Sequence, residues 1–374
     1  MSMAKLITPT PNPSAFMTLA KLDASNVRNI ETVNLIPSPR LNFILGPNGS
    51  GKTSLLEAIH ILGRARSFRS TQAGQVIRFQ QDDLTVAGKL KEGEASNPIA
   101  IGVRLGRRKR EIALAGARLN SSAELIRAFP VLLIQPSSSA LLDGAPKARR
   151  QFLDWGAFHL DASFLDNWRG YARALSQRNA LLRSGTRLGI EIWNHELVRY
   201  GTIVDSARCA YAERLRPYFH AAAGHFLGQT PFELGIMAGW DTAIPLDEVL
   251  RTDLALDLRD GYTHSGPHKG DFQVKAEGRS AKNYLSRGQM KLLVFALLLA
   301  QSHLLEESLG SKGCVLIDDL ASELDSDNRS KLLEFLNQRQ AQFFITATDP
   351  RIVEAAGAEE TAVFHVENGR VTKV

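Results

Sequence analysis

The sequence predicts an α/β fold in which a nucleotide-binding unit is interrupted by a helical segment. Two motifs and one change of pattern support this prediction. The stretch "GPNGSGKT" (46–53) lies between an apolar strand and a helix. An apolar strand followed by two acids, "CVLIDDLASELD" (314–325), lies near the C-terminus. Between them, residues 148–227 show helical spacing of their apolar side chains.

Composition narrows the class of protein. A chain of 374 residues has room for two or three domains. Its net charge of +6 and pI of about 9.3 suit a nucleic-acid partner. The two cysteines, Cys209 and Cys314, form neither a metal-binding pattern nor a disulfide framework. That cysteine pattern suits a reducing cytosol, so a cytoplasmic protein is expected. The longest apolar run, 292–300, is far shorter than the roughly 20 residues that span a membrane, so no membrane segment is expected; the basic pI argues against a membrane partner.

The elements follow one another in a clear order. Residues 1–16 contain Pro9, Pro11 and Pro13 and no apolar signal core, so a disordered leader is expected there. The later elements expected from the pattern are two hairpin-like strands (17–36), a buried strand (40–46), an amphipathic helix after the glycine loop, short strands (83–119) with a turn at "LGRRKRE" (105–111), a strand ending near Pro136, helices (148–227), mixed structure (228–260), and strands and helices to a C-terminal hairpin.

The glycine loop is predicted to bind the phosphates of ATP. Glycines allow backbone N–H groups to turn inward around phosphate oxygens. Lys52 would reach the β- and γ-phosphates, and the Thr53 hydroxyl would ligate Mg²⁺. The predicted nucleotide-binding residues of this loop are Gly46, Pro47, Asn48, Gly49, Ser50, Gly51, Lys52, Thr53 and Ser54.

The second motif supplies two acids at the end of an apolar strand. Asp318, at the strand end, is placed to hold Mg²⁺. Asp319, the next residue, could polarise the water that attacks the γ-phosphate. Strands often end in Asp, so the glycine loop is what makes the catalytic interpretation the stronger one.

A third stretch, "YLSRGQMKLL" (284–293), has a polar start and an apolar finish. The N-terminus of a helix favours an anion. The start of this helix carries Ser286, Arg287, Gly288 and Gln289. Ser286 lies 32 positions before Asp318 (318 − 286). At that distance "LSRGQ" resembles the signature of ABC ATPases, which closes on the nucleotide held by the other chain of a head-to-tail pair. The alternative is an ordinary helix cap, since serine is a good N-cap residue.

The spacing of the motifs separates related classes. Between Lys52 and Ser286 lie 234 positions (286 − 52), more than in a transporter head and fewer than in proteins with long coiled-coil inserts. The insert has helical spacing without sustained heptads. We therefore expect an ATPase lobe with the P-loop (17–146), a helical arm domain (147–260), and a second part of the ATPase lobe that carries the signature and Walker B strand (261–374).

Together these stretches resemble the RecF family of bacterial recombination-mediator ATPases. The matching segments are "NVRNIE", "GPNGSGKTSLLEAIHILGRARSFRS", "GAPKARRQFLDW", "THSGPHKGDF", "LSRGQMKLL" and "IDDLASELD". The resemblance implies an ABC-type P-loop ATPase head, with a mixed sheet and an antiparallel lobe, plus a helical arm. It implies an ATP-driven homodimer on duplex, gapped or junction DNA and slow DNA-stimulated ATP hydrolysis. It also implies roles in DNA repair, replication and the SOS response, with RecR, RecO and RecA as partners.

The chain departs from the family pattern at several positions. Val27 replaces the usual Phe, and Ser137 and Ser138 follow a strand where an acid is common. Gln135, at the end of that strand, is assigned a contact with Mg²⁺ and water; its alternative is simply to end the strand. A switch histidine is missing after the last core strand, where Thr348 and Asp349 stand. Hydrolysis is therefore expected to be slow.

Two further questions stay open at this point. The basic run "RLGRRKR" (104–110) is either a solvated hairpin tip or an edge that follows DNA phosphates. Arg66 and Arg69 could face DNA or the nucleotide. Two rival functions are an ABC-type ATPase subunit of a transporter, which requires a membrane partner, and a chromosome-organising ATPase, which requires a long coiled coil.

Overall fold

The computed structural model describes residues 17–92, 96–310, 313–319, 324–357 and 360–374. The chain divides into two compact units, one of Met1–Pro136 with Leu305–Val374 and one of Ser137–Leu304. This division places 261–304 with the second unit, whereas the sequence pattern assigned these residues to the ATPase lobe. The assignment of lobes and arm to functions stays a prediction. The predicted leader, 1–16, lies outside the described residues.

The first unit contains an antiparallel sheet of six strands in the order β2-β1-β4-β5-β6-β7. Its turn between β5 and β6 covers residues 107–109 and confirms the hairpin predicted at 105–111. The strands are β1 (Met17–Val27), β2 (Ile30–Leu35), β4 (Asp83–Glu92), β5 (Ile99–Gly106), β6 (Arg110–Leu114) and β7 (Ala117–Leu119), with the short helices η1 (Ala73–Gln75) and α2 (Ser122–Ala128).

A second sheet of the same unit has the order β15-β14-β3-β13-β12-β8. Only β14 and β15 pair antiparallel, so the carboxyl ends of the other strands meet at one edge. The strands are β3 (Leu41–Leu45), β8 (Val131–Ile134), β12 (Cys314–Ile317), β13 (Gln342–Ala347), β14 (Thr361–Glu367) and β15 (Arg370–Lys373), with the helices α12 (Ser326–Asn337) and α13 (Arg351–Ala356). The mixed sheet and the antiparallel sheet confirm the predicted fold class.

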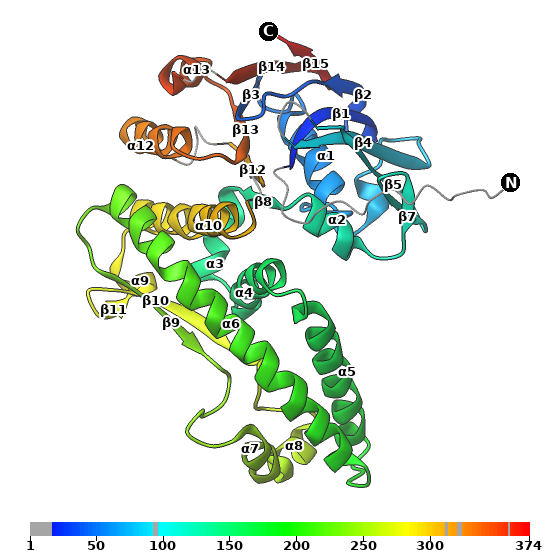
Figure 1. The fold of residues 1–374 in the computed structure, drawn as a ribbon, viewed down its shortest axis with the longest axis vertical. Coiled ribbons are helices and arrows are strands. Elements are labelled where there is room, and N and C mark those ends of the chain that lie inside the picture. Colours follow the sequence, from blue (N-terminus) through cyan, green and yellow to red (C-terminus); the bar gives the residue numbers. More distant parts are fainter. Residues whose placement is uncertain (1–16, 93–95, 311–312, 320–323, 358–359) are drawn as a thin grey trace, which may run out of the picture. The chain divides into compact units, whose positions relative to one another are not determined.

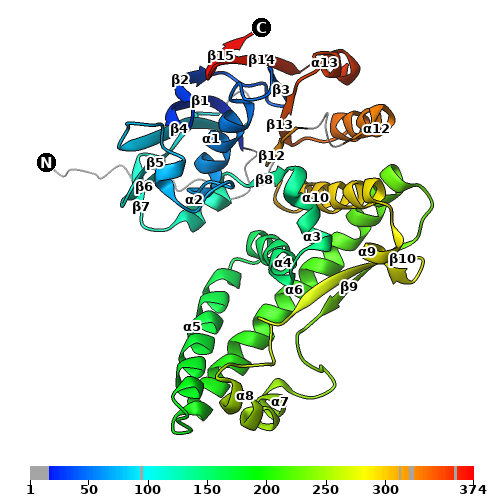
Figure 2. The ribbon, with the colours of Figure 1, turned by 180° about the vertical axis from the view of Figure 1, so that it is seen from behind.

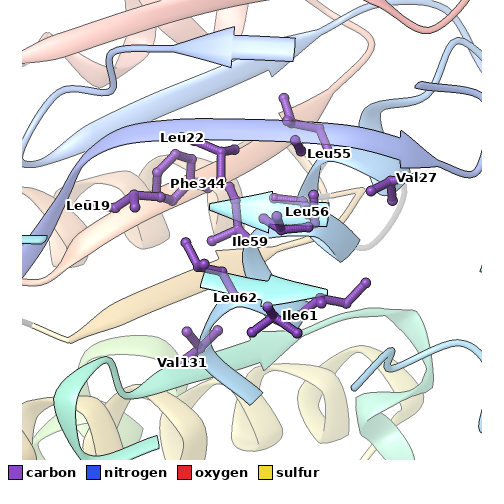
Figure 3. Close-up of a cluster of buried hydrophobic side chains, with 14 of the residues drawn as sticks. Leu19, Leu22, Val27, Leu55, Leu56, Ile59, Ile61, Leu62, Val131 and Phe344 are labelled. Carbon is purple, nitrogen blue, oxygen red and sulfur yellow. The ribbon is translucent and has the colours of Figure 1, made fainter. Parts of the chain in front are cut away.

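Helix α1 (Lys52–Arg64) forms the centre of the first unit. Its apolar side chains pack in one cluster with residues of both sheets, including Leu22 of β1 and Phe344 of β13 (Figure 3). Nearly every residue from Lys52 to Gly63 is buried. The sequence predicted an amphipathic helix with one solvent face; the structure covers both faces instead, because a sheet lies on each side.

The polar side chains of this buried helix are therefore paired. Glu57 is fully buried and accepts hydrogen bonds from Arg28 Nε at 2.8 Å and Arg28 Nη2 at 3.0 Å, and from the Ser67 hydroxyl. His60 lies 2.9 Å through Nδ1 from the Arg66 carbonyl. Burial lowers the pKa of His60 to about 3, so the ring is neutral at pH 7.

The second unit is mainly helical. Helices α5 and α6 run side by side along much of their length (Figures 1 and 2). A three-stranded antiparallel sheet, β11-β10-β9, packs on helices of the same unit. The elements that lie wholly or mainly in this unit are η2 (Pro136–Ser139), α3 (Ala140–Asp143), α4 (Pro146–Leu160), α5 (Phe164–Arg183), α6 (Ile190–Leu227), β9 (Phe232–Met237), α7 (Leu246–Thr252), α8 (Leu254–Asp260), β10 (Asp271–Ala276), β11 (Arg279–Ser280), α9 (Ala281–Tyr284) and α10 (Arg287–Leu309).

Within the described residues, helix α10 is the one whose length and composition resemble those of a membrane span. By length and composition, Arg287–Ser308 would be sufficient to cross a bilayer. However, 72% of its most apolar window is buried inside the protein. Within it, Gln301 Nε2 donates to the Tyr211 hydroxyl at 2.6 Å and to the Phe152 carbonyl at 3.1 Å. These are the properties of a core helix.

Candidate nucleotide-binding site

The glycine loop joins β3 to α1 at the edge where the parallel strands end. Pro47, Asn48 and Gly49 are exposed, whereas Ser50 and Lys52 are buried. Lys52 Nζ donates to the Gly46 carbonyl at 2.8 Å and to the Pro47 carbonyl at 3.0 Å. Burial lowers the pKa of Lys52, while the charges of Asp319 and Asp318 act against that shift. The ammonium group is thus held inside the turn of the loop.

The loop has little room for side chains on its inner surface. A Cβ on Gly46 would lie 2.3 Å from the Val366 carbonyl oxygen, so only glycine fits there. By contrast, a Cβ on Gly49 would meet nothing within 4 Å. The buried Ser50 hydroxyl has no hydrogen-bond partner among the described residues. Open space, a buried ammonium and an unsatisfied hydroxyl fit a loop that receives phosphate oxygens.

The predicted metal ligands lie together. Thr53 Oγ1 donates to Asp318 Oδ1 at 3.1 Å, although 265 positions separate the two residues. Asp318 directly follows β12, and its N–H donates to the Ile134 carbonyl of β8 at 2.8 Å. A hydroxyl and a carboxylate are oxygen ligands of the kind that Mg²⁺ binds. The residues therefore fit the metal that the loop sequence implies.

One residue of this edge was missed by the sequence analysis. Thr346, fully buried in β13, donates from Oγ1 to Asp318 Oδ1 at 2.8 Å and accepts from the Asp319 N–H at 2.7 Å. The parallel register pairs Ile345 with Ile317, which places Thr346 beside the acids. A hydroxyl residue next to the end of a mainly apolar strand was the available signal. The single hydroxyl orients both carboxylate-bearing residues.

Asp319 has an unusual backbone. Its φ of 54° places it in the left-handed region, which is uncommon for a residue other than glycine. Such a conformation persists where the surroundings fix it, and the bond to Thr346 does so here. Residues 320–323, which include the first two residues of the "SELD" segment, lie outside the described residues.

Gln135 comes directly after β8 and is half-buried at the same edge as Asp318. The pairing of Ile134 with Ile317 brings the ends of β8 and β12 together. Its contact with Mg²⁺ and water stays a prediction. Asp349, the other acid considered for this edge, accepts hydrogen bonds from Arg351 through both carboxylate oxygens, from Nε to Oδ1 at 3.0 Å and from Nη2 to Oδ2 at 2.7 Å. These hydrogen bonds lower the pKa of Asp349, so it is a weak base.

The signature residues belong to the second unit and are all exposed. The Ser286 N–H donates to Gln289 Oε1 at 3.0 Å, and the Gln289 N–H donates to the Ser286 hydroxyl at 3.3 Å. This reciprocal pair is a capping box. It caps the helix, as the alternative to the signature predicted, and also leaves Arg287 and Gly288 open to solvent at the helix N-terminus.

Side chains of the segment "THSGPHKGDF" form hydrogen bonds with helices of the second unit. Arg178 is fully buried and bonds Asp257 at 2.6 Å and the Thr263 hydroxyl at 2.8 Å. His268 Nδ1 lies 2.6 Å from the Tyr171 hydroxyl, and burial lowers the pKa of His268 to about 4. Within the described parts of the chain, no group of three or more metal-binding side chains is found. The segment therefore ties helices together.

Several of the basic residues singled out in the sequence form ion pairs with nearby acids. At the β5–β6 tip, residues 107–110 are exposed, while Lys109 lies 2.6 Å from Glu111. Arg104 pairs with Asp83 at 2.8 Å. Arg69 lies 3.8 Å from the buried Glu57 of the P-loop helix. These ion pairs do not show whether the hairpin tip or the "ARSFR" segment contacts DNA or nucleotide.

The sequence of this chain is similar to those of known proteins. Residues 18–372 match the family described as RecF/RecN/SMC N terminal domain. The chain is 42% identical to the DNA replication and repair protein RecF of Stutzerimonas stutzeri, over 96% of this chain and 98% of the relative. It is also 42% identical to the RecF of Shewanella denitrificans, over 96% of this chain and all of the relative.

Solved structures give the same result. The recombination mediator protein RecF of the RecFOR pathway, solved with ATP, is similar with a TM-score of 0.85 and 26% identity, over 98% of this chain and all of the other. The Smc head domain of Pyrococcus furiosus, at 14% identity and a TM-score of 0.60, covers 96% of each chain and shares the fold. With the P-loop, the acids at the strand ends and these relatives in agreement, the chain belongs to the RecF family of DNA replication and repair proteins.

Proposed function

We propose that the protein is an ATP-dependent DNA-binding protein of recombinational repair and replication-fork maintenance. The observation that carries this proposal is the Thr53–Asp318–Thr346 hydrogen-bond chain at the mouth of the P-loop. It joins the two motifs of a Mg²⁺–ATP site across 265 positions of sequence. Relatives named as DNA replication and repair proteins, and a RecF structure with ATP, supply the biological setting.

Each residue of the site has a proposed task. Lys52 moves from the loop carbonyls to the β- and γ-phosphates, exchanging two neutral acceptors for charged ones. Thr53 and Asp318 hold Mg²⁺, which would neutralise phosphate charge when bound. Asp319 orients and polarises the attacking water, with Gln135 beside it. Because Asp349 is bound to Arg351, we expect no second base from that loop and slow hydrolysis.

The dimer follows from the exposed signature. We propose that Ser286, Arg287, Gly288 and Gln289 of one chain close on the nucleotide of its partner, so that ATP stabilises a head-to-tail homodimer on DNA. Mass action then makes closure depend on bound nucleotide. DNA stimulates hydrolysis, and the dimer opens afterwards. RecR, with RecO and RecA in the same pathway, is the proposed protein partner in the cytoplasm.

A transporter ATPase subunit is the weaker alternative. The relatives compared above are RecF proteins, matched over nearly their whole length, and they favour the repair function. The chromosome-organising alternative requires a long coiled coil. In the described chain the longest helix is α6, with 38 residues, and it packs on α5, with 20 residues. These lengths fit a short arm.

The test is DNA binding at several salt concentrations with and without ATP. A dimer presents twice as many phosphate contacts as a monomer. ATP should therefore steepen the salt dependence, by roughly 0.9 in log–log slope for each added contact on duplex DNA. Gapped DNA and duplex DNA are compared side by side. DNA affinity that is absent under all of these conditions would contradict the proposal and reopen the transporter alternative.

A further inference from the structure

Two turns from opposite ends of the chain hold the same atom of the P-loop. The Ser50 carbonyl oxygen accepts one hydrogen bond from Asn29 Nδ2 at 3.1 Å and another from the Gly369 N–H at 2.8 Å. Asn29 lies in the turn between β1 and β2, and Gly369 lies in the turn between β14 and β15. Both turns belong to the first unit.

Holding this oxygen fixes the direction of the next N–H. A trans peptide is planar, and its C=O and N–H bonds point in opposite directions. No cis peptide bond is found in the described chain. Two donors on the Ser50 oxygen therefore turn the Gly51 N–H to the opposite side of the loop. Backbone N–H groups of this loop are what would meet phosphate oxygens.

Three glycines at these turns and in the loop have no room for an added side chain. A Cβ on Gly369 would lie 2.2 Å from the Asn29 carbonyl oxygen. A Cβ on Gly51 would lie 2.9 Å from Asn29 Nδ2, and one on Gly46 would meet the Val366 carbonyl of β14 at 2.3 Å. The C-terminal hairpin thus contacts both ends of the loop, and the Asn29 turn lies against its second half.

We propose that Asn29 and Gly369 are positioning residues that set the Gly51 N–H for phosphate binding from outside the P-loop motif. This inference rests on the proposed ATP-binding function and deepens it. It assigns the "NVRNIE" stretch and the C-terminal hairpin a role in orienting the backbone of the P-loop. Neither carries a group that reacts with nucleotide. Asn29 is exposed and lies beside the loop, so its replacement does not disturb the apolar core.

Gly369→Ala is the first test, because the chain contains a matched control. The β14–β15 turn has φ values of 49° at Asn368 and 78° at Gly369, and the β6–β7 turn has 53° at Ala115 and 81° at Gly116. A Cβ on Gly116 meets nothing within 4 Å. Gly116→Ala therefore adds the same backbone strain in the same kind of turn, away from the P-loop.

Asn29→Ala and Asn29→Asp form the second test. Alanine removes the donor, whereas aspartate keeps the shape and directs an acceptor at the Ser50 carbonyl. The loss of one neutral hydrogen bond corresponds to about a five- to tenfold change in affinity. We expect Asn29→Ala to weaken binding of a fluorescent ATP analogue with Mg²⁺ by about that factor. Asn29→Asp should weaken it further, and Gly369→Ala at least as much as Asn29→Ala.

The full chain is used throughout, and the thermal midpoint without nucleotide is measured beside each affinity. The inference is supported if Asn29→Ala loses affinity while its midpoint falls no further than that of Gly116→Ala, and if Gly369→Ala, which adds the contact with the Asn29 carbonyl to the same turn strain, loses affinity while Gly116→Ala does not. It is overturned if Asn29→Ala and Asn29→Asp bind like the parent while Lys52→Ala loses binding. If Lys52→Ala also binds like the parent, the proposed nucleotide function fails, and the inference fails with it.

Discussion

The P-loop edge and the signature helix differ in how firmly their groups are held. At the P-loop edge, Lys52, Asp318 and Thr346 are joined to backbone or to one another by buried or half-buried hydrogen bonds. At the signature, the side chains of Ser286 and Gln289 bond each other's backbone in a capping box, and all four residues are exposed. The first arrangement suits a nucleotide pocket whose groups are held in place within one chain. The second suits a surface that a partner completes.

The largest expected effect tests the second half of this comparison. Ser286→Arg places a long side chain at the proposed contact with the partner's nucleotide. We expect near-parental ATP binding by the monomer and no ATP-induced dimer in sedimentation at concentrations where the parent dimerises. DNA binding should also weaken, and its salt dependence should flatten. A variant that dimerises normally would show that "LSRGQ" is only a capped helix.

A mixing experiment controls for misfolding of that variant. Ser286→Arg protein combined with Lys52→Ala protein can form one intact composite site only if the chains pair head-to-tail. The other site of that heterodimer carries both substitutions. Partial recovery of ATPase activity on mixing therefore supports the geometry. Mixed protein with no more activity than either variant alone counts against it.

The next effect concerns hydrolysis. Asp319→Asn keeps the shape of the side chain and removes its basicity. General base catalysis contributes roughly 10²- to 10⁴-fold, so single-turnover hydrolysis should slow by about that range. ATP binding should stay near the parental value, and ATP-bound dimers should accumulate. Unchanged turnover would remove Asp319 from the chemical step and leave Gln135 as the candidate.

Lys52→Ala tests the first half of the comparison. It removes the charged donor to the phosphates, and hydrogen bonds to charged groups contribute about 1.5–3 kcal/mol. ATP affinity in equilibrium dialysis should fall by roughly 10- to 150-fold. Circular dichroism should show that the fold is retained, because Lys52 bonds only loop carbonyls in this structure. Lys52→Arg is the companion variant, since a planar guanidinium does not replace a point charge.

The smallest expected effect is at Thr346. Thr346→Val preserves the size of the buried side chain and removes the hydroxyl that orients Asp318 and Asp319. The Mg²⁺ concentration needed for half-maximal ATP binding should rise by about five- to tenfold, the equivalent of one hydrogen bond. Thr348→Val, two residues later and exposed, is the matched control and should leave this value unchanged. Equal behaviour of the two variants would show that Thr346 has no part in placing the acids.

Local patterns were sufficient for most elements, and they supplied the candidate site residues that stay predictions. The strand before the P-loop, the helix after it, the hairpin around 105–111 and the helices over 148–227 are all present. The buried environment of α1 could not be read from its own sequence, because a sheet formed by distant segments covers its second face. Thr346 was missed for the same reason: its role depends on the register of β13 against β12.

By itself, the sequence determined which residue types are available: glycines in a loop, an ammonium group after them, a hydroxyl and two carboxylates as candidate Mg²⁺ ligands, and a serine and a glutamine that cap the signature helix. These properties reside in short stretches, so spacing and residue type suffice. Only the tertiary structure decided which distant residues support them. The bond from Thr53 to Asp318, the Thr346 hydroxyl between two acids, and the two donors on the Ser50 carbonyl each join segments from different parts of the chain. Hydrogen bonds act over about 3 Å in space, and separation along the sequence does not restrict them once the sheets have brought their strands together.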